Sequence, residues 1–329
     1  MIALSSYPTY RPYIRLKVSL LLITLLRLSV CVVGAQTSNP QITSSQARIA
    51  QDLELIRMAE QEHLPQARQA ALWAQLALEY QHATEFLNAE DAYNRSLHLL
   101  KTAPSATAEY ASTLDNLGSL YLIYGRVDDA ESARKQALKA RQKLGNLSDI
   151  AVSYVHLADI ALARDQFRKA ERLALRGIEE MESSVNPPSG EMLFGFIVIT
   201  YARCSRGHSS EGLVSAEQAV AFANRNFGSE SAAVGFALDT LGFAEWKNGA
   251  TQDGEKAMLH GIQILRTKLA PADPRLAGAM LQYSAYLIAA NRKVEAQEIH
   301  EQVTRMTSQA GIFCPGCTVS VYSLSKTLR

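Results

Sequence analysis

Two stretches of the sequence, Leu114-Asp-Asn-Leu-Gly-Ser-Leu-Tyr121 and Leu238-Asp-Thr-Leu-Gly-Phe-Ala-Glu245, share a pattern although they lie far apart in the chain. Each places one large apolar residue four positions before a glycine and another immediately before it. Spacings of three and four residues put these side chains on one stripe of an α-helix. A small residue with similar neighbours recurs every 40–42 residues, which indicates an internal repeat. These first small positions are Ala77, Gly118, Ala158, Thr200, Gly242 and Ser284.

Each repeat has two further small positions, which predict where its helices touch. The second lies twelve residues after the first, and the third follows seven residues later. The distance between two packed helices depends on the side chains at their contact, so small residues allow a close approach. Each repeat is therefore predicted to be a hairpin of two α-helices. The second small positions are Ala89, Ala130, Ala170, Gly212, Gly254 and Ala296. The third are Ser96, Ala137, Gly177, Ala219 and Gly261, with Val303 as the exception.

The turns and starts of these helices have signals of their own. Most residues seven positions after the first small one tolerate the left-handed conformation that ends a helix. These turn positions are Thr84, Gly125, Asp165, Gly207, Gly249 and Asn291. Ser189, Ser229 and the pair Asp273-Pro274 are predicted to start helices, since serine and aspartate cap helices and proline suits the first turn. No part of the repeat region has the pattern of a strand, so we expect an all-α fold.

One repeat matches a known family pattern closely. The run Leu114-x-x-Leu117-Gly118-x-x-Tyr121, followed by Gly125, Ala130 and Ala137, resembles a tetratricopeptide repeat. Trp73-x-x-Leu76-Ala77-x-x-Tyr80 resembles a second copy, whereas Arg203 and Leu287 replace the tyrosine of the pattern in the fourth and sixth repeats. The long period is similar to that of kinesin light chains and of the MalT-like repeat region. The resemblance covers residues 66–306 and implies an α-α superhelix, or solenoid, of about six hairpins.

The amino terminus resembles a secretory signal. Three basic residues by position 17 precede the apolar run Val18–Leu26, and Val33-x-Ala35 puts small residues at a cleavage site. We expect residues 1–35 to be removed and the chain to be exported to the periplasm or outside the cell, with no stable membrane span afterwards. Arg27 interrupts the apolar run and disfavours a permanent span. The alternatives are an uncleaved membrane anchor, lipidation at Cys31, and a cytoplasmic chain with a misread start.

Two flanks border the repeats. Residues 36–65 are predicted to be a linker and a capping helix, whose residues 46–62 place Ile49, Leu53, Leu55 and Ile56 on or near one face. Residues 307–329 form a short non-helical tail in which Val319–Leu324 alternates like a strand. The tail contains Cys314-Pro-Gly-Cys317, for which we expect a local disulfide between Cys314 and Cys317 after export. Redox activity and free or metal-bound thiols are the alternatives for this pair.

The sequence favours a binding protein over an enzyme. After residue 35 the chain has 29 basic and 32 acidic residues, which lacks the basic footprint of a nucleic-acid-binding protein. It has no paired metal-binding histidines, phosphate loop or nucleophile elbow, so we predict no catalytic residues, metal or cofactor. The leading hypothesis is a non-enzymatic scaffold that binds a protein or peptide segment in a concave groove. The alternatives are a thiol–disulfide or metal-related factor, and a cytoplasmic sensor resembling the MalT-like proteins.

The resemblance also implies which residues line the groove. In that family the first helix of each hairpin faces inward, and residues at and near its first small position reach the groove. The residues carried over are Asp115, Ser119, Asp159, Tyr201, Asp239, Phe243, Trp246 and Lys247, with His156 nearby. We expect an aromatic, mildly acidic groove that suits a segment with apolar anchors and a basic residue. The alternative is that these aromatic side chains pack between neighbouring hairpins.

Overall fold

The computed structural model describes residues 40–309, except residues 84, 102–106, 124, 185–186 and 188. The predicted signal segment with Cys31, and the tail with Cys314 and Cys317, lie outside these residues. The described residues form thirteen α-helices and no strand. The helices are α1 Pro40–Gln61, α2 Gln66–His82, α3 Phe86–Lys101, α4 Thr107–Ile123, α5 Val127–Leu144, α6 Leu147–Ala163, α7 Phe167–Glu182, α8 Ser189–Ser205, α9 Ser209–Phe227, α10 Ala232–Lys247, α11 Thr251–Lys268, α12 Pro274–Ala289 and α13 Lys293–Gln309.

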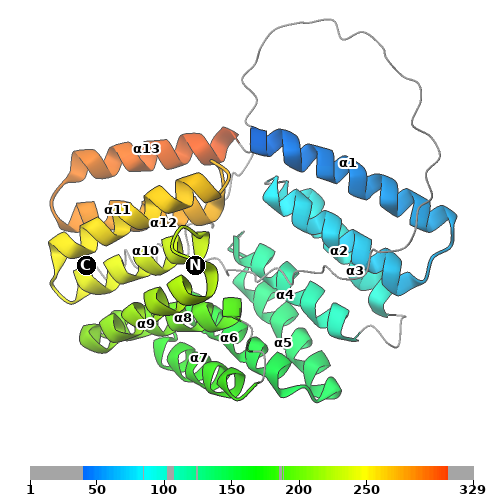
Figure 1. Cartoon of the computed structure of the whole chain (residues 1–329), viewed down its shortest axis with the longest axis horizontal. Helices are drawn as coiled ribbons and strands as arrows, with labels where there is room; N and C mark the ends of the chain where they lie inside the picture. Colours follow the sequence, from blue (N-terminus) through cyan, green and yellow to red (C-terminus); the bar gives the residue numbers. More distant parts are fainter. Residues whose placement is uncertain are drawn as a thin grey trace, which may run out of the picture.

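Helices α2 to α13 form six consecutive hairpins, which we call units 1 to 6. The units follow one another along a curved path from α1 to α13 (Figure 1). The first helices of units 3 to 6, which are α6, α8, α10 and α12, pack against one another in succession. Second helices such as α7 and α13 lie at the outer edge (Figure 1). The predicted all-α solenoid of about six hairpins is the fold that the structure has over these residues.

The small positions lie where the two helices of a unit meet, as predicted. All of those quoted above are buried, and Val303 is only 6% exposed. A Cβ atom on Gly118 would lie 3.4 Å from the carbonyl oxygen of Ala130. Gly242 and Gly254 come closer still, because a Cβ on Gly242 would lie 2.6 Å from the carbonyl oxygen of Gly254. The small positions identified from the sequence are therefore the positions at which the two helices of each hairpin pack against each other.

Left-handed residues end the first helices of units 2 to 6. Gly125, Asp165, Gly207, Gly249 and Asn291 all have φ between 57° and 91°. Asp165 and Asn291 show that the short polar side chains at these positions accept this conformation. The corresponding Thr84 of unit 1 lies outside the described residues.

The helix starts agree with the predicted signals at two positions and differ at one. Asp273 caps α12, because its side chain accepts a hydrogen bond from the Arg275 backbone N–H, and Pro274 follows it. The serine that caps α10 is Ser231 rather than Ser229, since the Ser231 side chain accepts from the Val234 backbone N–H. Helix α8 begins at Ser189, as predicted.

Helix α1 packs on α2 as a cap, but its buried face differs from the predicted one. Ile49 and Ile56 are 8% and 4% exposed, whereas Leu53 and Leu55 are 43% and 38% exposed. The residues that accompany the two isoleucines on the buried face are Ser45, Asp52 and Ala59. Leu53 has the same spacings to the two isoleucines, four and three residues, so the helical period alone does not distinguish it from Asp52.

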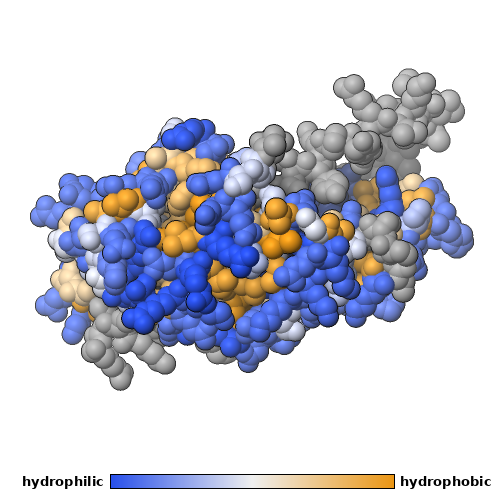
Figure 2. Space-filling view, turned by 90° about the horizontal axis from the view of Figure 1, so that it is seen from below, coloured by the Kyte–Doolittle hydropathy of each residue, from blue (hydrophilic) through white to orange (hydrophobic). Residues whose placement is uncertain are grey.

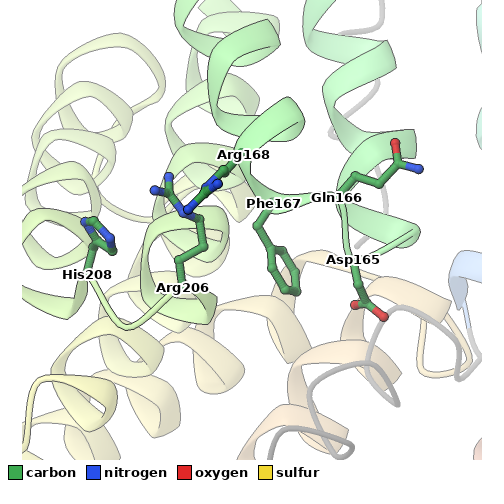
Figure 3. A pocket seen from close by; sticks show the side chains of 6 residues that line it. All are labelled: Asp165, Gln166, Phe167, Arg168, Arg206 and His208. Atoms are coloured by element: carbon green, nitrogen blue, oxygen red, sulfur yellow. The ribbon is translucent and has the colours of Figure 1, made fainter.

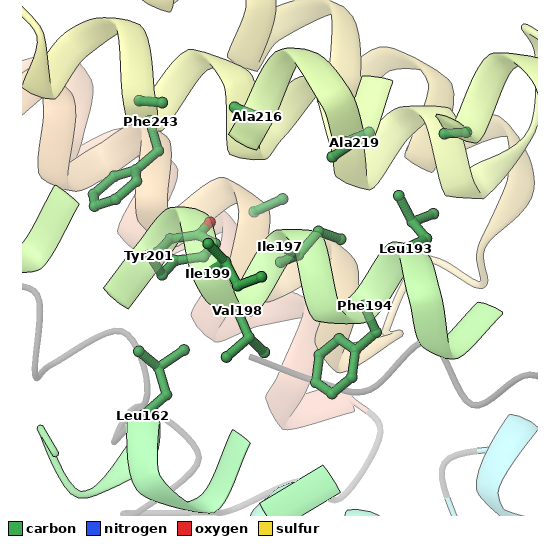
Figure 4. Packing of buried hydrophobic residues seen from close by; sticks show 14 of the residues in the cluster. Leu162, Leu193, Phe194, Ile197, Val198, Ile199, Tyr201, Ala216, Ala219 and Phe243 are labelled. Atoms are coloured by element: carbon green, nitrogen blue, oxygen red, sulfur yellow. The ribbon is translucent and has the colours of Figure 1, made fainter. Parts of the chain in front are cut away.

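The apolar core has two main parts. Helices α6 to α13 share one continuous cluster, in which the side chains of α8 pack between α6, α9 and α10 (Figure 4). A second cluster joins α2 to α5. Helices α4 and α6, one from each part, make little contact with each other. The layer between them is filled by charged side chains of α5, and these determine where several of the predicted groove residues point.

Candidate functional site

The predicted groove residues of units 2 and 3 are buried in an ion-pair layer. Arg134 of α5 is 0% exposed, and its Nη1 donates to Asp159 Oδ2 of α6 at 2.8 Å. Its Nη2 donates to the Ser119 Oγ of α4 at 3.2 Å. Arg141, two turns further along α5, donates to Asp115 of α4. These aspartates and Ser119 therefore hold neighbouring helices together and do not present a surface to a partner.

His156 and Glu191 complete this layer. The Nδ1 of His156 lies 3.1 Å from Asp115 Oδ1. Burial by itself would raise the pKa of Asp115, but His156, Arg141 and Arg134 outweigh this effect and lower it to about 2. Burial raises the pKa of Glu191 on α8 to about 7. The carboxylate of Asp115 is thus ionised and internally compensated at neutral pH.

Asp239 on α10 contributes no surface charge to the expected acidic groove either. It is 7% exposed, and burial raises its pKa to about 8, so its carboxyl group is largely protonated at neutral pH. Its carbonyl oxygen accepts a hydrogen bond from Gln282 Nε2 of α12 at 3.0 Å. Gln282 in turn accepts from the Tyr201 hydroxyl of α8 at 2.5 Å. This chain of hydrogen bonds links the first helices of units 4, 5 and 6.

The aromatic residues of units 4 to 6 form a ladder across α8, α10 and α12. Tyr201 stacks on Phe243 with ring centroids 4.6 Å apart, and Phe243 meets Trp246 edge-on at 6.1 Å. Trp246 meets Tyr286 edge-on at 5.8 Å, and Tyr286 stacks on Tyr283 at 6.0 Å. Phe243 is 0% exposed and Tyr201 is 6% exposed, so these two pack between units. Trp246 is only partly buried and remains accessible.

Lys247 lies beside the middle of the ladder. Its Nζ is 4.4 Å from the centroid of the Trp246 ring and 5.7 Å from that of Phe243, which are cation–π distances. Burial lowers the pKa of Lys247 below its ordinary value, because the ammonium group is partly removed from water. Among the described residues, no carboxylate forms an ion pair with it. Of the predicted groove residues, Trp246 and Lys247 are thus the two that can meet a partner.

Sequence reasoning missed the residues that organise this region. Arg134 and Arg141 follow Ala130 and Ala137 by four positions each, so they share the buried stripe of α5. This spacing was the signal in the sequence that could have identified the two arginines. It places them on a buried helix face, where each needs a carboxylate partner. Tyr286 and Gln282 were missed because their contacts join different units. No sequence period encodes which side chains of separate units meet.

The cysteine in the described part of the chain is not activated. Cys204 is buried, and burial raises the pKa of its thiol to about 12, which makes it a poor nucleophile. No group of three or more potential metal ligands comes together within residues 40–309 as described. None of the described helices has the length and apolar character needed to cross a bilayer.

Comparison with known proteins supports the fold. No protein-family model and no curated protein matches the sequence. The apo form of RapI has a TM-score of 0.65 and 10% identity, over 81% of this chain and 95% of that one. Aspartyl phosphate phosphatase F from Bacillus subtilis has a TM-score of 0.63 and 12% identity, over 81% and 69%. A Rap protein complexed with competence and sporulation factor has a TM-score of 0.51 and 12% identity, over 82% and 78%.

These likenesses define a class of fold. The chain has the architecture of a tetratricopeptide-type helical repeat protein, as its repeat pattern predicts. At 10–12% identity the likeness extends to the fold alone.

Proposed function

We propose that this chain is a non-enzymatic scaffold that binds a segment of a partner protein or peptide at Trp246 and Lys247. The observation behind the proposal is the environment of Lys247, whose ammonium group is partly buried on two aromatic rings without an internal carboxylate. A desolvated cation is costly unless it is paired. A partner carboxylate would supply that pair, and the adjacent Trp246 ring would receive an apolar side chain.

The similar structures support this class of partner. One of them is a Rap protein in complex with competence and sporulation factor. Competence and sporulation factor is a ligand of the Rap protein. The complex illustrates that a protein with this type of fold binds a separate molecule. The charge expected of the partner differs from the sequence-based expectation, which was basic. Asp115 and Asp159 are neutralised internally, Asp239 is largely protonated, and the accessible charge is that of Lys247.

Lys247→Ala is expected to weaken partner binding by about 10-fold or more, as loss of a hydrogen bond between charged groups does. The partner would first be isolated by affinity capture from the envelope fraction and mass spectrometry, and its Kd measured by calorimetry. Lys247 is preferable to Trp246 as the probe, because Trp246 also packs against Phe243 and Tyr286.

Two variants serve as controls for this experiment. Lys247→Arg should preserve most of the binding. Lys256→Ala, on the exposed surface of α11, should leave binding unchanged. An unaltered Kd for Lys247→Ala would contradict the proposed site, and an equal loss in Lys256→Ala would indicate general electrostatics.

Export is part of the proposal. Support comes from the basic residues, apolar run and small residues of positions 11–35. We expect the mature protein to begin at Gln36 and to be found outside the cytoplasm. Amino-terminal sequencing of the native protein tests this directly. A native chain that begins at Met1 in the cytosol would contradict it.

A further inference from the structure

A second candidate surface lies at the turns of units 3 and 4. A pocket of about 420 Å³ is located between the α6–α7 turn and the α8–α9 turn (Figure 3). Arg168 and Arg206 extend into it from these two units, whereas the carboxylate of Asp165 points away from them (Figure 3). The pocket is lined by Asp165, Gln166, Phe167, Arg168, Arg206 and His208.

A neighbouring pocket of about 360 Å³ follows the surface of α7. Arg168 lines both pockets, so the two are adjacent, and we call the surface that they form along α7 the α7 groove. From Phe167 to Leu175 this groove spans about 12 Å of helix, at roughly 1.5 Å per residue. The second pocket is lined by Arg168, Glu171, Arg172, Leu175, Arg176 and Glu179.

The arginines of the groove are not fully compensated inside the protein. Arg168, Arg172 and Arg176 follow one another at intervals of four residues, so their like charges share one face of α7 and repel one another. Arg176 has its own partner, since its Nε donates to Glu180 Oε1 at 2.8 Å. Arg168 and Arg172 are exposed and form no ion pair with any described residue.

One of the two glutamates that line the second pocket is already shared. Glu171 accepts from Arg203 Nε at 2.8 Å and also from Arg206. Arg203 stands where the tetratricopeptide pattern has a tyrosine, so this departure from the repeat adds a charge beside the groove. Glu171 thus serves two arginines of unit 4, and Arg168 and Arg172, which have no ion pair among the described residues, are available to an external anion.

Apolar side chains lie beside these charges. Leu175 is 43% exposed, and Phe167 is half-buried at the other end of the groove. The face of the molecule seen from below shows the same mixture, with hydrophobic patches among hydrophilic side chains (Figure 2). A ligand that satisfies both kinds of group must combine carboxylates with apolar side chains.

We propose that the α7 groove binds an acidic segment of a partner protein, whose carboxylates pair with Arg168 and Arg172 and whose apolar side chains contact Phe167 and Leu175. Arginine suits this role, because its planar guanidinium binds a carboxylate through two parallel hydrogen bonds. This proposal and the one at Trp246 and Lys247 rest on different residues, so each is tested by its own variants.

Synthetic peptides test the proposal with the whole purified chain. We would use fluorescent peptides of about 12 residues, enough to span the groove in helical form, composed of Glu, Leu and Gly in varied orders. The same set with Lys in place of Glu serves as the charge control. We expect Glu peptides to bind, Lys peptides not to bind, and both Arg168→Glu and Arg172→Glu to raise Kd by about 10-fold or more.

Lys169→Glu is the matched control, since it makes the same charge change at an exposed neighbouring position that lines neither pocket. It should alter Kd by less than about twofold, and all three variants should keep the wild-type melting temperature. Equal loss in Lys169→Glu would overturn the proposal in favour of general charge attraction. Absence of Glu-peptide binding would also overturn it. Displacement of the peptides by inorganic phosphate alone at low concentration would identify a phosphate site instead.

Discussion

Arg134→Ala is expected to lower the free energy of unfolding by about 3–5 kcal/mol, the usual result of removing one partner of a buried ion pair. The guanidinium of Arg134 is fully buried and donates to Asp159, Ser119 and the His156 carbonyl oxygen. Without it, the carboxylate of Asp159, whose side chain is 2% exposed, has no ion-pair partner among the described residues. Urea denaturation followed by circular dichroism measures the loss.

The double variant Arg134→Met/Asp159→Leu distinguishes the ion pair from simple packing. Replacing both partners by apolar side chains removes the uncompensated charge, so most of the stability should return. Arg57→Ala is the surface control, because Arg57 and Glu54 form an exposed pair within α1, and we expect a change of less than about 1 kcal/mol. If Arg134→Ala unfolds at the wild-type urea concentration, Arg134 does not join units 2 and 3 as described.

Gly242→Leu is expected to destabilise the fold by about 3 kcal/mol, at the upper end of the usual cost of overpacking. A Cβ at this position would lie 2.6 Å from the Gly254 carbonyl oxygen and 2.8 Å from the Met258 backbone nitrogen. Both atoms belong to the backbone of α11, so α10 and α11 would have to separate. The same denaturation experiment measures this effect.

Gly278→Ala is the matched control for Gly242→Leu. Gly278 is also a helical glycine, in α12, but apart from the adjacent backbone of its own helix no heavy atom lies within 4 Å of a Cβ built there. Alanine should therefore stabilise the protein by about 0.5–1 kcal/mol, through its higher helix propensity. A destabilisation by Gly278→Ala, or a neutral result for Gly242→Leu, would contradict the helix packing described above.

The sequence predicted the hairpins well because each is a local structure. Gly118 and Ala130 are twelve residues apart, and Gly249 lies only seven residues after Gly242. Contacts and turns between residues so close in sequence recur in every repeat. They therefore produce a periodic pattern that is visible in the sequence. The prediction of the capping helix was less accurate, because α1 has no repeat to compare with. Helix α1 has more apolar residues than its buried face accommodates, and the side chains of Leu53 and Leu55 remain exposed.

The candidate binding surfaces were much less predictable. The family pattern placed Asp115, Asp159 and Phe243 in an open groove, yet all three are buried between units. The reason is that side chains of neighbouring units reach them. Arg134 of unit 2 pairs with Asp159, His156 of unit 3 lies beside Asp115, and Tyr201 of unit 4 stacks on Phe243. The α7 groove was not predicted at all, since Arg168 and Arg206 belong to different units and lie far apart in the sequence.

The sequence by itself determined the all-α class, the number of hairpins and the positions where the helices of each hairpin touch. These properties depend on residue size and on the helical period within single units, both of which are visible along the chain. Only the tertiary structure decided which charges are compensated internally and which remain accessible. That outcome depends on how tightly successive units pack, and so on pairs such as Arg134 with Asp159 and Tyr201 with Gln282, which join separate units.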